Sequence, residues 1–245
     1  MLGGKTAVVT GASSGIGAAV ARALRDAGVR VAGGARRVDR LETEVALELD
    51  VADTASCERF VEGALAGLGG GLDILVNNAG LALGRDPFDL STEEDEEAVL
   101  ETNVHGLVRM TRLCLPHLRD GGHIVNLGSV AGMAAYPNGA LYVTSKFAVH
   151  GFTQALREDL LGRPIRITNV APGLVETDFS KVRFRGDEEK ARSVYADVAL
   201  GGPMRPEDVA ECILFALTRP PHVNVDEIVV TALAQSSGAR ILREE

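Results

Sequence analysis

Short apolar runs alternate with longer amphipathic stretches along most of this chain. Runs of four to seven apolar residues bounded by turn signals are typical of strands that are buried on both faces. The longer stretches have helical periodicity, and glycine or proline marks many of their ends. We expect strands over residues 5–10, 29–34, 45–49, 72–76, 123–127, 165–170 and 226–231.

Helices are expected between these strands, and whether the longest of them is continuous stays open. Strands that alternate with helices form βαβ units, which build a parallel sheet covered on both faces. No linker or break in composition divides the 245 residues, a length that suits one α/β domain. The sequence therefore predicts a single doubly wound α/β domain over 1–245, with helices over residues 15–27, 54–66, 91–118, 140–161 and 206–218.

One charged segment does not fit this alternation. Residues 179–200 follow a strand and a Pro-Gly turn, and their periodicity is weak. Insertions at the carboxyl ends of strands often cover active sites. We expect this segment to form a substrate lid; a plain surface loop is the alternative.

The charge of the chain limits its partners. A net charge of −9 and a pI near 5.1 argue against a nucleic-acid binder and against an anionic membrane surface. We expect no leader segment, no membrane-spanning helix and no metal site, because no long apolar run or ligand cluster occurs. The three scattered cysteines fit free thiols in the cytoplasm: Cys57, Cys114 and Cys212.

A glycine-rich turn joins the first strand to the first helix. Such a turn lets the backbone approach a pyrophosphate, and the helix N-terminus supplies amide donors and a positive dipole. The position of this motif between a strand and a helix makes it much more specific for nucleotide binding than glycines alone would be. The expected phosphate-binding residues are Gly11, Ser13, Ser14, Gly15, Ile16 and Gly17.

The end of the second strand indicates which nucleotide is bound. An acidic residue usually accepts the ribose 2′-hydroxyl of NAD there, but this chain has Arg36 and Arg37 instead. A guanidinium suits a 2′-phosphate, so we expect NADP, with Arg36 as the first choice of partner. Further along, Asp50 and Val51 are expected at the adenine, and Asn78, Ala79 and Gly80 along the cofactor.

Three residues in the second half of the chain carry acid–base chemistry. Tyr142 and Lys146 are four positions apart on a predicted helix, so they lie on one face. An ammonium beside a phenol stabilises the phenolate, and we expect it to lower the pKa of Tyr142. Ser129 follows a strand and should meet them at the same sheet edge. This set predicts hydride transfer between a nicotinamide and a carbonyl or alcohol.

These motifs together resemble the classical short-chain dehydrogenase/reductase family, and they occur in its order along nearly the whole chain. They are TGASSGIG (10–17), NNAG (77–80), NVHG (103–106), Ser129, YVTSK (142–146) and PGLVET (172–177).

The resemblance implies a Rossmann-type domain with a seven-stranded parallel sheet, and a homotetramer or homodimer. It implies a catalytic tetrad of Asn103, Ser129, Tyr142 and Lys146. In the family, Tyr142 and Lys146 also contact the cofactor. The nicotinamide carboxamide would be held by Pro172, Gly173, Val175 and Thr177.

The C-terminal third is similar to one subgroup, the bacterial NADP-dependent 3-hydroxy acid (serine or allo-threonine) dehydrogenases. The loop before Tyr142 departs from that subgroup. A hydroxy acid needs a cation for its carboxylate, and Arg183 and Arg185 in the expected lid are the candidates. Three alternatives remain at this stage: a reductase of a neutral ketone or aldehyde, a non-catalytic NADP-binding regulator, and a purely structural interaction protein, which would not need all of these motifs.

Overall fold

The computed structural model describes residues 2–244, and in this part of the chain a seven-stranded sheet forms the centre. All neighbouring strands run parallel, in the order β3-β2-β1-β4-β5-β6-β7. The strands are β1 (Thr6–Thr10), β2 (Arg30–Ala35), β3 (Val45–Glu48), β4 (Leu72–Asn77), β5 (Leu118–Leu127), β6 (Arg166–Pro172) and β7 (Glu227–Val230). The expected parallel α/β fold with seven strands is confirmed.

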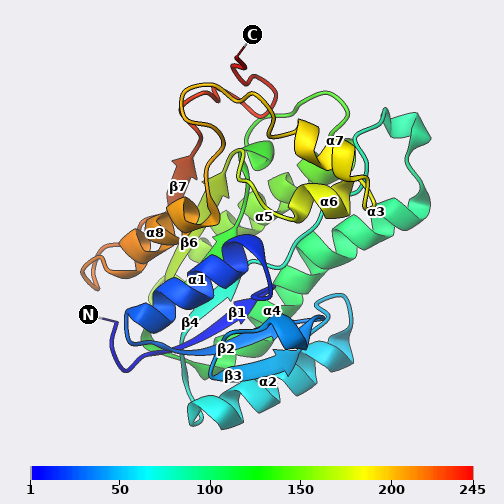
Figure 1. Cartoon of the computed structure of the whole chain (residues 1–245). Helices are drawn as coiled ribbons and strands as arrows, with labels where there is room; N and C mark the ends of the chain where they lie inside the picture. Colours follow the sequence, from blue (N-terminus) through cyan, green and yellow to red (C-terminus); the bar gives the residue numbers. More distant parts are fainter. Residues whose placement is uncertain (1, 245) are drawn as a thin grey trace.

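Helices cover both faces of the sheet (Figure 1). On one face, α1 and α8 pack on the strands through an apolar cluster that includes Leu24 and Ile213. On the other face, α2, α4 and α5 pack through Phe60, Met110 and Leu156. The longer helices are α1 (Gly15–Asp26), α2 (Thr54–Leu68), α3 (Glu93–Leu100), α4 (Gly106–Cys114), α5 (Ala140–Asp159) and α8 (Pro206–Leu217).

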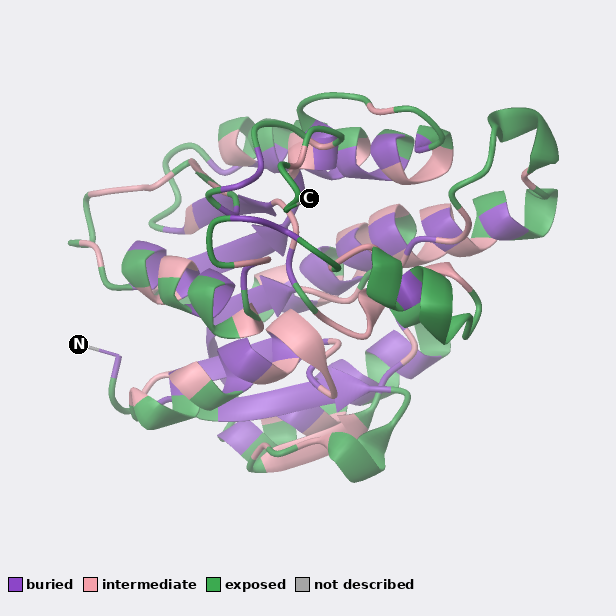
Figure 2. Ribbon diagram, turned by 45° about the horizontal axis from the view of Figure 1, so that its top comes forward, coloured by how far each residue is buried: buried purple, intermediate pink, exposed green. Residues whose placement is uncertain are grey.

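The inner strands are the most deeply buried layer, whereas the edge strands β3 and β7 are only partly buried and the outer faces of the helices are exposed (Figure 2). Runs such as TAVVT in β1 are buried at every position, as expected for a strand covered on both sides. No helix in the described chain is long and apolar enough to cross a bilayer.

The expected long helix over 91–118 is interrupted. A π-helical turn, Glu101–His105, separates α3 from α4, and a 3₁₀ turn that contains Pro116 follows α4. Proline lacks an amide hydrogen and cannot continue an α-helix, which explains why α4 ends before Pro116. Strand β5 then begins at Leu118, five residues earlier than the apolar run suggested.

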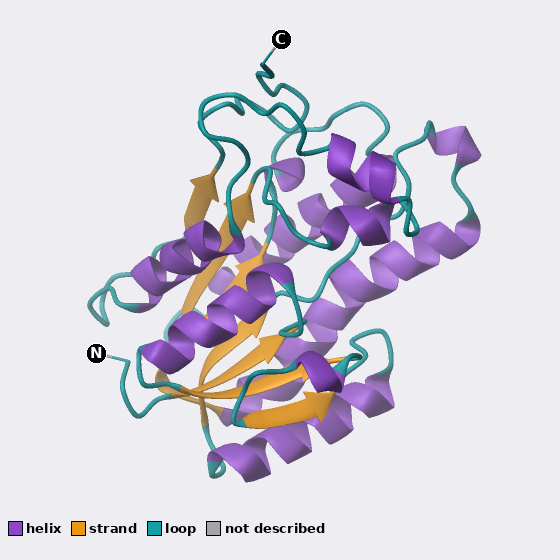
Figure 3. Cartoon of the chain, in the orientation of Figure 1, coloured by secondary structure: helices purple, strands orange, loops and turns teal. Residues whose placement is uncertain are grey.

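The segment after β6 folds into two short helices, α6 (Phe179–Arg183) and α7 (Glu188–Ser193). They lie beyond the carboxyl ends of the strands, close to the C-terminal segment (Figure 3). Arg243 donates to the carbonyls of Val194 and Ala196, which ties that segment to the chain after α7.

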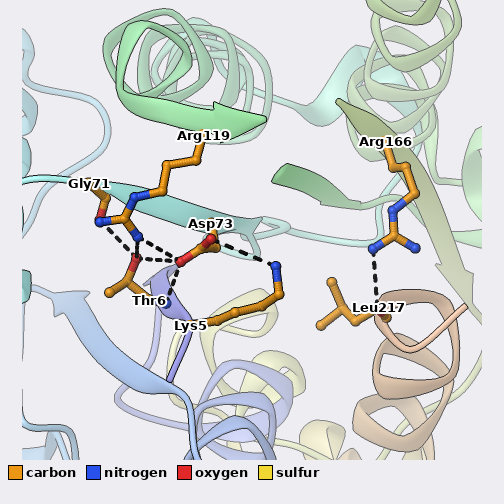
Figure 4. A network of polar contacts seen from close by, with 7 residues as sticks. All are labelled: Lys5, Thr6, Gly71, Asp73, Arg119, Arg166 and Leu217. Atoms are coloured by element: carbon orange, nitrogen blue, oxygen red, sulfur yellow. Dashed lines mark hydrogen bonds and ion pairs between the residues drawn. The ribbon is translucent and has the colours of Figure 1, made fainter. Parts of the chain in front are cut away.

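A polar network lies at the amino ends of β1 and β4, opposite the carboxyl ends of the strands (Figure 4). Asp73 accepts hydrogen bonds from the amide and hydroxyl of Thr6, and it pairs with Arg119 at 2.9 Å and Lys5 at 3.7 Å. Burial alone would raise the pKa of Asp73, but these hydrogen bonds and charges outweigh it and hold the pKa below its usual value. The network therefore stabilises the edge that lies away from the site described next.

Candidate active site

A cavity of about 560 Å³ opens at the carboxyl ends of the strands, where β1 and β4 are neighbours. The chain order reverses between these two strands, and ligands of open α/β sheets bind at such a switch point. Segments from eight separate parts of the chain meet there. Predicted residues in its lining are Gly11, Ser13, Ser14, Gly15, Ile16, Arg36, Arg37, Asp50, Val51, Asn78, Ala79, Gly80, Ser129, Tyr142, Lys146, Pro172, Gly173, Val175 and Thr177.

Two polar side chains join the ends of β1 and β4. The Thr10 hydroxyl accepts hydrogen bonds from the amides of Asn78 and Ala79, each at 3.0 Å. In return, Asn78 Nδ2 donates to the carbonyls of Thr10 and Gly11 at 2.9 and 3.2 Å. The NNAG segment therefore fixes the shape of the glycine-rich turn as well as lining the cavity.

The glycine-rich turn has little room for side chains. Gly11 has a φ of +68°, and a Cβ on it would lie 2.9 Å from Asn78 Nδ2. Gly17 does not line the cavity, although it was expected to touch the cofactor. It is buried in the first turn of α1, where a Cβ would overlap the Gly11 carbonyl. Its role is to let α1 start close to β1.

Arg36 and Arg37 follow β2 at one end of the cavity. Arg37 donates to the Ser14 hydroxyl at 3.1 Å. Among residues 2–244, no carboxylate lies within ion-pair distance of either arginine. Both guanidinium groups are thus available to an anion beside the phosphate-binding turn.

Tyr142 and Lys146 lie one turn apart on α5, and Ser129 begins the turn after β5. Lys146 Nζ donates to the Leu127 carbonyl at 2.7 Å and lies 5.8 Å from the centroid of the Tyr142 ring. The Ser129 hydroxyl donates to the Pro172 carbonyl at 3.4 Å. A hydroxyl, a phenol and an ammonium therefore share one wall of the cavity.

The pKa of the phenol differs from the expectation. Burial raises the pKa of Tyr142 to about 12, although the Ser129 hydroxyl and the Arg183 guanidinium act in the opposite direction. Burial also lowers the pKa of Lys146 to about 8. Desolvation is therefore the largest cause of both shifts, and it disfavours the Lys146 ammonium as well as the Tyr142 phenolate. The lowered phenol pKa predicted from sequence is wrong for this structure.

Asn103 supports the site from the π-helical turn between α3 and α4. Its Oδ1 accepts from the Leu81 amide, and its Nδ2 donates to the Leu81 carbonyl, both at 2.8 Å. Nδ2 also donates to Ser145 Oγ on α5 at 2.9 Å. The wide turn, a type that often occurs at functional sites, lets one amide side chain link the segment after NNAG to α5.

Only one of the two predicted lid arginines faces the phenol. The Arg183 guanidinium carbon is 5.6 Å from the centroid of the Tyr142 ring. Arg185 turns away at a φ of +53° and pairs with both oxygens of buried Asp95, at 2.5 and 2.6 Å. Arg185 Nη2 is thus engaged by Asp95, and Arg183 is the better placed of the two, although neither arginine is among the residues that line the cavity.

Several residues near the site were not singled out from the sequence. Apolar and small side chains in the cavity wall carry no motif of their own: Ala35, Leu49, Leu81, Thr102, Leu127, Gly128, Phe179 and Val182. Tyr136 is also near, because its hydroxyl accepts a hydrogen bond from Arg183 at 3.0 Å. In the sequence, only its position between Ser129 and Tyr142 indicates that Tyr136 could lie near the site. Within residues 2–244, no group of histidine, cysteine and acidic side chains could hold a metal ion.

Comparison with known proteins identifies the family. Residues 5–188 match the short chain dehydrogenase family. The chain is 40% identical to an NADP-dependent 3-hydroxy acid dehydrogenase of Schizosaccharomyces pombe, covering 100% of this chain and 98% of that protein. It is 39% identical to the enzyme of the same description from Escherichia coli, with 97% and 99% covered. The chain belongs to the short-chain dehydrogenase family.

Solved structures agree with this assignment. A serine dehydrogenase complexed with NADP⁺, in its closed form, superposes with a TM-score of 0.90 at 37% identity, covering 98% of this chain and 100% of that one. A serine dehydrogenase from Escherichia coli gives 0.79 at 34% identity, with 94% and 99% covered.

Proposed function

We propose that this protein is an NADP-dependent dehydrogenase that interconverts the alcohol and carbonyl forms of a small 3-hydroxy acid. The observation that carries the proposal is that Ser129, Tyr142 and Lys146 line one cavity while the Arg183 guanidinium lies beside the phenol. The relatives described as 3-hydroxy acid dehydrogenases support the same reaction.

The cavity fits a dinucleotide with a 2′-phosphate. A Cβ on Gly15 would lie 3.1 Å from Thr177 Cγ2, so glycine at this position lets the turn lie close to Thr177. Arg36 and Arg37 would hold the 2′-phosphate, as charged donors with no carboxylate partner. Asp50 and Val51 would border the adenine.

The nicotinamide end would lie against the other wall of the same cavity. Residues after β4 and β6 would hold this half, and the backbone after Pro172 would bind the carboxamide. They are Asn78, Ala79, Gly80, Pro172, Gly173, Val175 and Thr177.

The bound cofactor supplies the hydride acceptor for alcohol oxidation. The Ser129 hydroxyl donates a hydrogen bond to the substrate oxygen, and the Tyr142 phenolate accepts the proton that leaves this oxygen. The Lys146 ammonium would bind the nicotinamide ribose and place a positive charge beside the phenolate. Asn103 keeps the helix and the NNAG loop in register for this transfer. In carbonyl reduction, Tyr142 returns the proton.

Arg183 is the proposed partner of the substrate carboxylate. A 3-hydroxy acid carries its carboxylate two carbons from the reacting oxygen, so a cation close to Tyr142 is required. The Arg183 guanidinium lies close to the Tyr142 ring, and its Nε donates to the Gly84 carbonyl at 3.0 Å. The guanidinium retains donors for a carboxylate.

Residues 179–200 form the proposed substrate lid. Phe179 and Val182 line the cavity, and the ring of Phe179 packs edge-on against Tyr142 at 5.6 Å. The Arg185–Asp95 pair fastens the segment to α3.

We also infer a homotetramer or homodimer in the cytoplasm. Apolar side chains on α8, on the edge strand β7 and on the chain after it remain exposed, with 51% of Phe215, 49% of Val229 and 82% of Leu233 accessible. Exposed apolar side chains of this kind are typical of subunit contacts. The free thiols of Cys57, Cys114 and Cys212 fit a reducing compartment.

A substrate panel tests the function. NADP reduction would be followed by absorbance with L-serine, L-allo-threonine, 3-hydroxypropionate, 3-hydroxyisobutyrate and neutral secondary alcohols, with NAD in parallel. The proposal predicts turnover of hydroxy acids with NADP. Turnover confined to neutral alcohols would refute the substrate class, and turnover with NAD alone would refute the cofactor.

A further inference from the structure

Tyr136 lies in the loop between Ser129 and Tyr142 and contacts the guanidinium that faces the catalytic phenol. Its hydroxyl accepts a hydrogen bond from Arg183 Nη2 at 3.0 Å. The Arg183 Cζ atom is also 5.9 Å from the centroid of the Tyr136 ring and 5.6 Å from that of Tyr142. One guanidinium is therefore placed between two tyrosines.

Two glycines hold the ring of Tyr136 in place. A Cβ on Gly139 would overlap Tyr136 Cε2 and lie 2.7 Å from Cζ. A Cβ on Gly238, from the C-terminal segment, would lie 3.1 Å from Cδ1. Gly139 has a φ of −121°, which any residue can adopt, so space alone requires glycine there. The backbone at Gly139 and Gly238 therefore packs against the two edges of the Tyr136 ring.

The second anchor of Arg183 comes from the loop after β4. Nε donates to the Gly84 carbonyl at 3.0 Å, and the Gly84 amide donates to the Arg183 carbonyl at 2.9 Å. With Nε and one Nη2 hydrogen occupied, the plane of the guanidinium is fixed. Its remaining donors are available on one edge of that plane.

We propose that Tyr136 is a positioning residue that determines substrate specificity by holding Arg183 in the orientation that accepts the carboxylate of a short 3-hydroxy acid. The proposal rests on the proposed function and deepens it. Tyr136 does not touch the reacting atoms; it acts through Arg183. Long side chains are costly to immobilise, so a pre-ordered guanidinium binds a carboxylate more tightly than a free one.

The first test compares Tyr136→Phe with the wild type on two substrates, 3-hydroxypropionate and a neutral secondary alcohol. The variant keeps the ring but loses the acceptor of the Arg183 hydrogen bond. We expect KM for the hydroxy acid to rise about tenfold, while kcat for it and KM for the neutral alcohol change less than twofold. An unchanged KM for the hydroxy acid, or equal changes for both substrates, would overturn the proposal.

Tyr195→Phe is the matched control. Tyr195 lies in the lid, and its hydroxyl accepts from Ser180 Oγ at 2.7 Å without contacting Arg183. Its loss should affect both substrate classes alike, because it leaves the carboxylate partner in place. A selective loss of hydroxy acid affinity in this variant would show that removal of a tyrosine hydroxyl without a contact to Arg183 has the same effect, and would overturn the specific role of Tyr136.

A double-mutant cycle with Gly139→Ala tests whether Tyr136 acts through the position of its ring. Alone, this substitution should displace the Tyr136 ring and raise KM for 3-hydroxypropionate at least as much as Tyr136→Phe does. In a Tyr136→Ala background, Gly139→Ala should add less than twofold, because no ring remains to displace. Additive effects of the two substitutions would contradict positioning through the ring.

The wild-type panel separates this inference from the proposed function. If the wild type oxidises only neutral alcohols, the hydroxy acid assignment fails, and the role of Tyr136 fails with it. If the wild type oxidises hydroxy acids and Tyr136→Phe has the same KM, the function stands and the positioning role alone is refuted.

Discussion

The guanidinium of Arg183 lies against the ring of Tyr142, with its carbon 5.6 Å from the ring centroid. Arg183 comes from the segment after β6, whereas Tyr142 is on α5, so the fold brings the proposed carboxylate partner next to the proposed acid–base residue. The guanidinium opposes the effect of burial on the pKa of Tyr142. In the proposed mechanism, substrate binding and proton transfer would therefore be linked electrostatically.

This link predicts a change in pH dependence. In Arg183→Met, the pKa of Tyr142 should be higher, because the charge that favours the phenolate is lost. Oxidation needs the phenolate. When kcat for a neutral alcohol is measured against pH, the rising limb of the profile should therefore move to higher pH. Arg183→Lys, which keeps a charge, should move it less. Superimposable profiles of wild type and Arg183→Met would contradict the link.

Removal of the phenol should abolish most of the chemistry. Tyr142→Phe should lower kcat by about 10²- to 10⁴-fold, as expected for loss of general acid–base catalysis. The dissociation constant of NADPH, measured by its fluorescence, should change little, since the phosphate end of the cavity is untouched. A variant with kcat within tenfold of wild type would exclude Tyr142 as the proton acceptor.

Cofactor preference should depend on the residues after β2. Arg36→Met and Arg37→Met should each weaken NADP binding about tenfold or more and leave NAD binding nearly unchanged, because only NADP has the 2′-phosphate. Arg40→Met is the matched control, since Arg40 is exposed in the same turn but outside the lining of the cavity. Equal losses for NADP and NAD would contradict the assignment.

The Arg185–Asp95 pair should act on the lid and not on substrate selection. Asp95 is only 9% exposed, so removal of Arg185 leaves a buried carboxylate without its partner. Arg185→Met should therefore change kcat/KM for hydroxy acids and neutral alcohols by the same factor, and Asp95→Asn should partly reverse that loss. A loss confined to hydroxy acids would restore Arg185 as a carboxylate ligand.

Acid stability should depend on His123. Its ring is buried in β5, and its Nε2 contacts Thr168 Oγ1 at 2.7 Å. Burial lowers its pKa from the model-peptide value of 6.5 to about 3, so the unfolded chain binds a proton that the folded chain excludes. Stability should fall as pH decreases from about 6.5 towards 3. His123→Gln should flatten this part of the profile of free energy of unfolding against pH.

Several features could be predicted from sequence because they depend on local pattern. The alternation of strands and helices predicted the parallel sheet. The location of the cavity was predicted from the glycine-rich turn, from Ser129 and from the spacing of Tyr142 and Lys146. These signals involve residues near one another in the chain, or chain ends that a parallel sheet brings to one edge.

Long-range packing could not be predicted in the same way. Arg183 and Arg185 are equivalent in sequence, and only Asp95, ninety positions away, separates their roles. The pKa of Tyr142 depends on desolvation by the whole cavity wall, which the Tyr142–Lys146 spacing does not reveal. Tyr136 contacts Arg183 across 47 positions and belongs to no motif.

The most direct test of the central claim is the steady-state oxidation of 3-hydroxypropionate with NADP by the wild type and by Arg183→Met. A neutral secondary alcohol is measured in parallel. We predict that the wild type oxidises the hydroxy acid and that the substitution raises its KM at least tenfold, with less than a twofold change in KM for the neutral alcohol. Equal changes in KM for both substrates, or a wild type without activity on any hydroxy acid, would contradict the account.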